Sequence, residues 1–236
     1  MNHEVNTRQS GFTIIELMLA MAFVAALLLA VAMTIVQIGT IYNKGMTLKE
    51  VNQTGRVISD DIRRSIASSS VFDRDTSFFT TSTGGRLCTG QMSYVWNYAE
   101  AIQNNDPDRI TFQDSNDEIR LFKIPDAASA YCARSGTNFV YNEVRPIDQL
   151  EGSELLRQGD RTLSIHNVDV IEPVNGDDPL TGQRLYTVSF AIGTGDTTAL
   201  TDDRTACLPP GNVNANFAFC AVQEFTLVTR AGNRVN

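Results

Sequence analysis

Proline is missing from the first 106 residues of this 236-residue chain, and charged side chains are missing from residues 17–43. Proline interrupts helices and a charge is costly in hydrocarbon, so both absences favour a long helix that can enter a membrane. Basic residues are also in deficit, because 19 lysines and arginines face 27 aspartates and glutamates, for a net charge of -8. Phosphate backbones would repel such a chain, so we expect no direct contact with nucleic acid.

Recognisable catalytic signatures are lacking as well. The chain has no Gly-x-Ser-x-Gly elbow, no Walker phosphate loop and no cysteine with a plausible histidine partner. His166 is the only histidine beyond residue 43, and it lies in a stretch with the pattern of a strand. We therefore expect that the protein has no catalytic residues and is not an enzyme.

Cysteine is scarce, but its count is even and its positions are informative. The four residues lie beyond the apolar run and include no Cys-x-x-Cys pair, which makes a metal site the weaker interpretation. In a domain outside the cytoplasm, four cysteines indicate two disulfides with three possible pairings. Pairing Cys88 with Cys132 and Cys207 with Cys220 is the simplest of these, since neither loop is nested in the other.

Acidic loops are the remaining place for a cofactor. Two long irregular connections, at residues 175–183 and 193–216, each carry a pair of adjacent aspartates. Such carboxylates could hold a calcium ion, but the spacing of an EF-hand is absent and solvated acidic turns are more common. We expect no metal and no cofactor, with calcium as the open alternative. The pairs are Asp177 with Asp178, and Asp202 with Asp203.

The apolar run at residues 12–43 is longer than the roughly 20 residues that cross a bilayer core. A secretory signal peptide has a shorter hydrophobic region, of about 7–15 residues, and its small-residue cleavage site follows that region. Here the glycine that marks a candidate processing site precedes the run. We expect residues 12–43 to span the membrane and to stay attached to the rest of the chain.

A helical pattern continues through residues 44–70. Apolar side chains recur at spacings of three and four with Gly55 filling a gap, and charged side chains occupy the opposite side. This predicts the amphipathic half of one long helix, embedded along one stripe in a globular head. A break near Gly39 or Gly45 is the alternative. The stripe consists of Leu48, Val51, Gly55, Ile58, Ile62 and Ile66.

Residues 71–236 are expected to form one head domain with an antiparallel sheet packed on that stripe. Apolar and polar residues alternate through residues 186–192, as in a half-buried strand. The turn sequence at residues 114–117 predicts a hairpin between two further strands, at residues 109–113 and 118–124. Trp96 is expected in a core strand rather than in an exposed adhesive patch. Other predicted strands are residues 138–142, 162–171 and 223–229. The predicted fold class is therefore α+β.

The most specific motif lies at the start of the apolar run, in the sequence Ser-Gly-Phe-Thr-Ile-Ile-Glu-Leu of residues 10–17. A hydrophilic stretch ends in Gly11, the aromatic Phe12 follows, and Glu16 is the acid nearest the uncharged span. A carboxylate at the end of a membrane helix is costly unless it is compensated, and such groups are functional by default. The charge of Glu16 has no expected partner within its own apolar helix.

This motif closely resembles the class III signal of type IV prepilins. The resemblance implies that residues 1–11 are a leader peptide, which a prepilin peptidase cleaves between Gly11 and Phe12 on the cytoplasmic side. It also implies N-methylation of Phe12 and an assembly contact between Glu16 and the N-terminal amine of an adjacent subunit. The expected architecture is pilin-like, with the membrane helix leading into the β head.

Residues 53–64 resemble the corresponding helix of PilW-type minor pilins, and the J-type pseudopilins of type II secretion are similar. We expect a minor pilin that helps to initiate or cap a type IV pilus. A secretion pseudopilin is one alternative, and a membrane-anchored extracytoplasmic binding domain with an uncut N-terminus is another.

The resemblance also implies the partners and the location. Expected partners are other pilin subunits, the prepilin peptidase, the inner-membrane assembly platform and, before assembly, the membrane itself. The protein would cross the inner membrane once with its head outside the cytoplasm, and would later belong to a filament at the cell surface.

Overall fold

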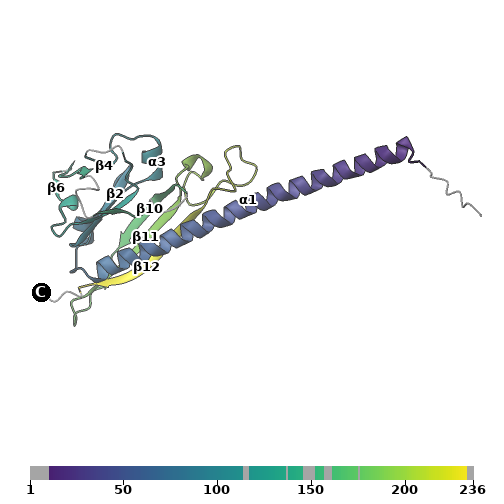
Figure 1. Cartoon of the computed structure of the whole chain (residues 1–236). Helices are drawn as coiled ribbons and strands as arrows, with labels where there is room; N and C mark the ends of the chain where they lie inside the picture. The colour runs from purple at the N-terminus through teal and green to yellow at the C-terminus, as the bar shows by residue number, and fades with distance from the viewer. Residues whose placement is uncertain are drawn as a thin grey trace, which may run out of the picture. The chain divides into compact units, whose positions relative to one another are not determined.

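The computed structural model describes residues 11–113, 117–136, 138–145, 152–156, 161–174 and 176–232. The chain divides into two compact units, Met1–Tyr42 and Asn43–Asn236. Helix α1 (Ile14–Ala67) begins in the first unit and ends in the second, where it contacts antiparallel β-sheets. The fold is thus α+β, as the sequence predicts (Figure 1).

The first unit contains the apolar part of α1. Its most apolar window has a mean hydropathy of 2.7, and none of that window is buried by protein. Large side chains such as Phe23 and Ile35 are 70% and 64% exposed. Among the described residues, α1 is the one helix that is long and apolar enough to cross a membrane.

In the second unit, one face of α1 is buried. The predicted stripe is confirmed from Val51 onward, with Gly55 among the buried residues. Leu48 was expected to belong to the stripe, and this is wrong because its side chain is 38% exposed. Thr47, one residue earlier and about 100° away around the helix, takes the buried position. The buried residues are Thr47, Val51, Gly55, Ile58, Ile62, Ser65 and Ile66.

Three long antiparallel strands, β10 (Leu163–Ile171), β11 (Arg184–Thr194) and β12 (Val222–Ala231), form the sheet that packs on α1. Along β11 the inward side chains alternate with half-buried ones, which confirms the period of two. Figure 1 shows the last turns of α1 running beside β11 and β12. The inward residues of β11 are Tyr186, Val188, Phe190 and Ile192.

A second antiparallel sheet has the strand order β1-β2-β3-β5-β9. Trp96, on β3, is 1% exposed and belongs to the main core, so its prediction as a core residue is confirmed. The strands are β1 (Phe78–Thr80), β2 (Gly84–Cys88), β3 (Met92–Asn97), β5 (Leu121–Pro125) and β9 (Ser153–Glu154).

Short elements complete the described part of the head. Strand β4 (Thr111–Phe112) runs parallel to β8 (Glu143–Val144), and β6 (Arg134–Ser135) pairs with β7 (Asn138–Phe139). The helical turns are α2 (Arg74–Ser77), α3 (Ala99–Gln103), η1 (Ala130–Cys132) and η3 (Thr197–Ala199).

Of the hairpin predicted between residues 109–113 and 118–124, the described residues show one antiparallel bridge, which joins Thr111 to Glu118. The expected ladder between the two strands is not formed there, because β4 pairs with β8 and β5 lies between β3 and β9. The pairing of β5 with β3 buries Phe122 and Ile124 completely. Burial of these side chains in the second sheet outweighs the local preference for a turn. Residues 114–116 of the predicted turn lie outside the described residues.

Both disulfides pair the cysteines without nesting. Cys88 of β2 is bonded to Cys132 of η1, and Cys207 is bonded to Cys220 just before β12. The first bond closes a loop with a sequence separation of 44, and the second closes one of 13. Two disulfides are typical of a domain that matures outside the cytoplasm.

Candidate functional site

The residues of the prepilin-like motif lie together at the beginning of α1. Gly11 and Phe12 precede the helix, and Phe12 is 87% exposed. Thr13 is the residue directly before the first helical turn, and Glu16 is the third residue of the helix. Cleavage after Gly11 would therefore leave one residue, Phe12, ahead of the helix cap.

Thr13 and Glu16 form a reciprocal capping box. The backbone N–H of Thr13 donates to Oε2 of Glu16 at 2.9 Å, and the Thr13 hydroxyl donates to the same oxygen at 2.8 Å. In return, the backbone N–H of Glu16 donates to Oγ1 of Thr13 at 3.3 Å. These bonds satisfy amide groups that have no carbonyl partner at a helix start.

The capping box gives Glu16 an uncharged polar partner that was not predicted from the sequence. Thr13 supplies two hydrogen bonds, although neither carries a positive charge. The pattern Thr-x-x-Glu just before an apolar run is a known signature of a helix start and could have identified Thr13 from the sequence. Both bonds to the carboxylate use Oε2, and no described residue donates to Oε1.

At the other end of the apolar run, the head begins with a contact to the loop closed by Cys207 and Cys220. Nζ of Lys44, the first charged residue after the run, donates to the carbonyl of Cys220 at 2.5 Å. One turn later, Oγ1 of Thr47 donates to the carbonyl of Ala218 at 3.2 Å. This loop is therefore fixed to the first turns of α1 in the head.

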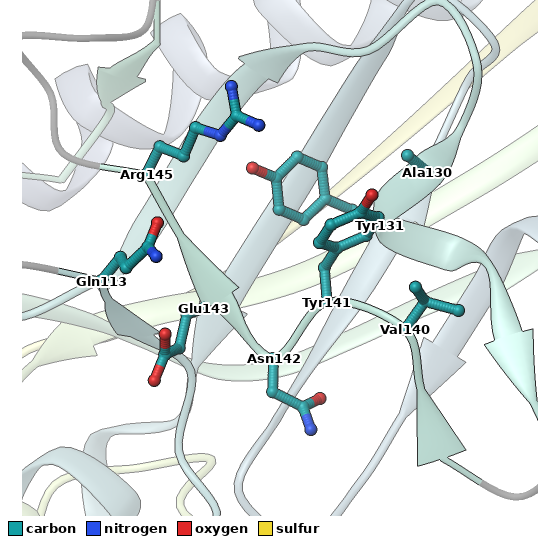
Figure 2. Close-up of a pocket in the computed structure, with 8 residues that line it drawn as sticks. All are labelled: Gln113, Ala130, Tyr131, Val140, Tyr141, Asn142, Glu143 and Arg145. Carbon is teal, nitrogen blue, oxygen red and sulfur yellow. The ribbon is translucent and has the colours of Figure 1, made fainter.

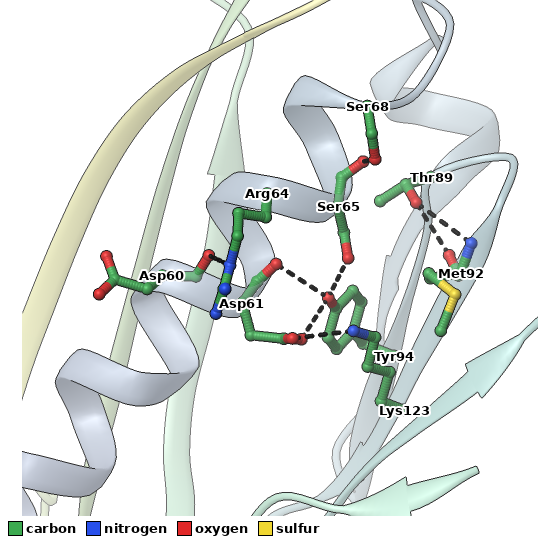
Figure 3. Close-up of polar contacts among 9 residues, drawn as sticks. All are labelled: Asp60, Asp61, Arg64, Ser65, Ser68, Thr89, Met92, Tyr94 and Lys123. Atoms are coloured by element: carbon green, nitrogen blue, oxygen red, sulfur yellow. Dashed lines mark hydrogen bonds and ion pairs between the residues drawn. The ribbon is translucent and has the colours of Figure 1, made fainter. Parts of the chain in front are cut away.

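A polar network joins the last turns of α1 to the second sheet (Figure 3). The Tyr94 hydroxyl of β3 donates to Oδ2 of Asp61 at 2.8 Å and lies 2.6 Å from the Ser65 hydroxyl. Lys123 of β5 pairs with Oδ1 of Asp61 at 2.8 Å. Burial raises the pKa of Tyr94 far above its usual range, so the phenol stays neutral and acts as a donor. The network fixes the helix against this sheet by directional bonds in addition to apolar packing.

A cavity of about 540 Å³ lies beside η1 and β8. Arg86 of β2 is buried beneath its walls and donates to the carbonyls of Tyr131 and Tyr141 and, at 3.2 Å, to Oδ1 of Asn142. Its guanidinium also stacks on Phe139 at 3.9 Å from the ring centroid. Burial lowers the pKa of Arg86 to about 10, which leaves it charged at neutral pH.

Arg86 thus shapes the pocket without taking part in its lining. Figure 2 shows the rings of Tyr131 and Tyr141 close together on one wall, with their centroids 6.0 Å apart. Glu143 and Arg145, on the segment that continues from Tyr141, offer charges of opposite sign (Figure 2). The pocket can present ring faces and hydrogen-bonding groups to a ligand. Its described lining residues include no nucleophile beside a base. The lining residues are Gln113, Ala130, Tyr131, Val140, Tyr141, Asn142, Glu143 and Arg145.

His166 lies in β10, as predicted, and is 7% exposed. Its Nε2 is 3.1 Å from the Thr194 carbonyl, to which it donates, and its Nδ1 has no hydrogen-bond partner among the described residues. Burial, together with the nearby charge of Arg204, lowers the pKa of His166 to about 4. The imidazole is therefore neutral at physiological pH and serves as a core group of the sheet.

The acidic loops use their carboxylates locally. Asp178 accepts hydrogen bonds from the Leu180 amide and the Thr181 hydroxyl, and Asp203 accepts from the hydroxyls of Thr201 and Thr205. Within the described ranges, no group of three or more histidine, cysteine or acidic residues is placed to hold a metal ion.

The predicted site residues therefore occupy separate places. Gly11, Phe12 and Glu16 lie at the start of α1, whereas both disulfides belong to the head. No protein-family model, curated protein or solved structure matches this chain. The pilin-like character thus depends on the long apolar helix, on its packing against antiparallel sheets and on the motif ahead of it.

Proposed function

We propose that this protein is a minor pilin that helps to initiate or cap a type IV pilus. The observation that carries the proposal is the order of features along α1. Gly11, Phe12 and the capping box precede an uncharged stretch that no protein covers, and the same helix then enters a β head. A structural subunit needs this combination, because one helix must serve first as a membrane anchor and later as the contact between subunits.

Processing would convert the anchored precursor into an assembly-ready subunit. A prepilin peptidase would cleave after Gly11, and methylation would modify the amine of Phe12. The head would stay outside the cytoplasm, where its two disulfides persist. An inner-membrane assembly platform and other pilin subunits would be the partners, and the subunit would act without catalysis.

Glu16 would guide assembly through its charge. Its Oε2 is occupied by Thr13, while Oε1 can accept a donor from outside the chain. The N-terminal amine of an incoming subunit is a cation of suitable size for that oxygen. In a medium of low dielectric such a pair attracts far more strongly than in water, so it would also set the axial register of neighbouring helices.

The decisive experiment is a mass spectrum of the N-terminus of the protein isolated from cells. The proposal expects a first residue Phe12 that carries one additional methyl group. A Gly11→Val variant should remain uncut, because a side chain at this position obstructs the narrow substrate channel that a peptidase needs. An intact peptide across Gly11 and Phe12 in assembled filaments would overturn the proposal and favour an anchored binding domain.

A pseudopilin of type II secretion remains the second candidate, since residues 53–64 resemble the helices of both classes. Deleting the gene separates the two. Loss of surface pili with normal secretion supports the minor pilin, whereas loss of secreted enzymes with normal piliation supports the pseudopilin. Both outcomes are compatible with the same cleavage after Gly11, so this experiment complements the mass spectrum.

A further inference from the structure

The loop closed by Cys207 and Cys220 differs in character from the rest of the acidic head. Residues 205–223 contain no charged side chain in a protein with a net charge of -8. Three large apolar residues of this loop are exposed: Val213 at 99%, Phe217 at 48% and Phe219 at 42%. An uncharged loop that exposes two aromatic rings and a valine indicates an interaction surface for another apolar partner, such as a protein or a membrane.

Contacts within the head place this loop at the start of the head's part of α1. Lys44 and Thr47 donate to the carbonyls of Cys220 and Ala218. Nζ of Lys44 also lies 5.3 Å from the ring centroid of Phe217. Because Lys44 directly follows the uncharged run, the loop is held where the chain leaves that run.

A second cation accompanies the other ring. The guanidinium of Arg161 lies 4.8 Å from the ring centroid of Phe219. The Arg161 side chain approaches Glu50 at 4.0 Å, and its backbone N–H donates to the same carboxylate. Glu50 therefore contacts Arg161, which in turn lies against Phe219 of the loop. Each exposed phenylalanine is thus paired with a cation on the same surface.

The length of the uncharged run fixes the depth of Lys44. Residues 17–43 are 27 residues, which span about 40 Å as a helix at 1.5 Å per residue. A bilayer with its interfacial regions is about 40–45 Å thick. If residues 17–43 cross it, Lys44 lies among the headgroups, and so does the loop that is bonded to it.

We propose that the Cys207–Cys220 loop is a second membrane contact of the unassembled subunit, with the lipid bilayer as its occupant. Val213, Phe217 and Phe219 enter the boundary between headgroups and acyl chains, as apolar side chains of interfacial segments do. Lys44 and Arg161 face the lipid phosphates, where basic side chains are favoured. This inference rests on the membrane span of the proposed function.

Such a contact would attach the head at two points. The helix alone leaves the head free to rotate about the segment that emerges from the membrane. Insertion of the loop would restrict that rotation and hold one side of the head on the bilayer until the subunit is extracted. The disulfide and the bonds to Lys44 and Thr47 already order the loop, so binding costs little additional conformational entropy.

Quenching of tryptophan fluorescence by brominated lipids tests the proposal on the full-length protein in vesicles. Trp96 is 1% exposed and gives a background that is measured with the unsubstituted protein. Phe217→Trp and Val213→Trp place a reporter in the loop. Leu180→Trp is the matched control, since Leu180 is 94% exposed in the connection at the opposite end of β11. Met33→Trp reports on the apolar part of α1.

We expect both loop variants and Met33→Trp to lose emission in brominated vesicles relative to unbrominated ones, while Leu180→Trp keeps its emission. Quenching of Met33→Trp without quenching of either loop variant would overturn the loop contact and leave the membrane span intact. If Met33→Trp is also unquenched, the proposed span itself fails. Val213 makes little contact with the protein, so its variant stays informative even if Phe217→Trp disturbs the fold.

Discussion

A Cβ atom at Gly55 of α1 would lie 2.1 Å from Cζ of Phe225 on β12, so the helix meets this strand through a glycine. Phe225 is in turn stacked on Phe190 of β11, with ring centroids 5.4 Å apart. The aromatic pair therefore occupies space that a side chain at position 55 would need. Close approach of the helix to the sheet depends on the missing methyl group.

Gly55→Ala should destabilise the head by about 1–3 kcal/mol, the usual effect of overpacking a core. Gly45→Ala is the matched control in the same helix, because nothing lies within 4 Å of a Cβ atom there. Removing a helical glycine at that open position should stabilise by about 0.5–1 kcal/mol. Denaturant unfolding followed by Trp96 fluorescence measures both changes. Equal shifts in the two variants would contradict the close contact with Phe225.

The two disulfides should differ in their contribution to stability. The Cys88–Cys132 bond closes a loop with a sequence separation of 44, against 13 for Cys207–Cys220. In the chain-entropy model, removing the bond that closes the longer loop costs about 4 kcal/mol of stability, and removing the bond that closes the shorter loop costs about 3 kcal/mol. Unfolding of the two double Cys→Ala variants tests this order. Labelling of the unfolded, unreduced protein with a thiol reagent should find no reactive cysteine, and a labelled cysteine would refute the pairing.

Charge and capping at Glu16 can be separated by Glu16→Gln. Glutamine can replace glutamate in a capping box, so the start of α1 should be preserved while the negative charge is lost. Membrane insertion and cleavage after Gly11 should continue, and incorporation into sheared filaments should fall. Thr13→Val, which removes the hydroxyl of the box but keeps the Glu16 charge, is the control and should retain more incorporation. Wild-type incorporation of Glu16→Gln would exclude a role for the charge.

His166 should make the head less stable in acid. The pKa of the buried imidazole is lowered to about 4, against about 6.5 in an unfolded chain, so the unfolded state binds more protons between these values. Its stabilising contribution is fully present above about pH 6.5 and is lost as the pH falls towards 4. The loss amounts to about 3 kcal/mol at 1.36 kcal/mol per pKa unit.

His166→Gln provides the comparison for this pH dependence. Its amide can still donate to the Thr194 carbonyl but does not titrate. Burial raises the pKa of Glu154, which contributes with the opposite sign in both proteins and cancels in the difference. The free energy of unfolding of the unsubstituted protein should therefore fall by about 3 kcal/mol relative to that of His166→Gln as the pH falls from 7 to 4. A difference that does not change with pH would show that His166 is accessible to protons in the folded head.

Features encoded by neighbouring residues could be predicted from the sequence. The uncharged run is one continuous stretch, and the stripe from Val51 to Ile66 recurs at spacings of three and four residues. Helix α1 contains both. Thr13 was missed, although its spacing to Glu16 is equally local. Leu48 was misplaced because a stripe read from apolar residues alone does not reveal that Thr47 bonds to Asn43 and Ala218.

Strand pairing could not be predicted, because partners are chosen across long sequence distances. Strand β5 pairs with β3 and β9, although a good turn sequence connects it to β4. The polar network of Asp61, Tyr94 and Lys123 likewise brings three separate elements together. The contacts of Arg86 beneath the pocket could not be predicted from the sequence, since its partners are mainly backbone carbonyls of distant loops. A sequence shows side chains but not which carbonyls surround them.

The contact between α1 and β12 has a consequence for the order of synthesis. The stripe of α1 that ends at Ile66 is translated before any strand of the head, and β12, which covers part of it, begins only at Val222. About 150 residues separate the two, so at 5–20 residues per second roughly 8–30 s pass before the ribosome begins to synthesise β12. During this interval the stripe of the nascent chain is open to water or to a chaperone. A chain that stops before Val222 would lack β12 and could not close this part of its core.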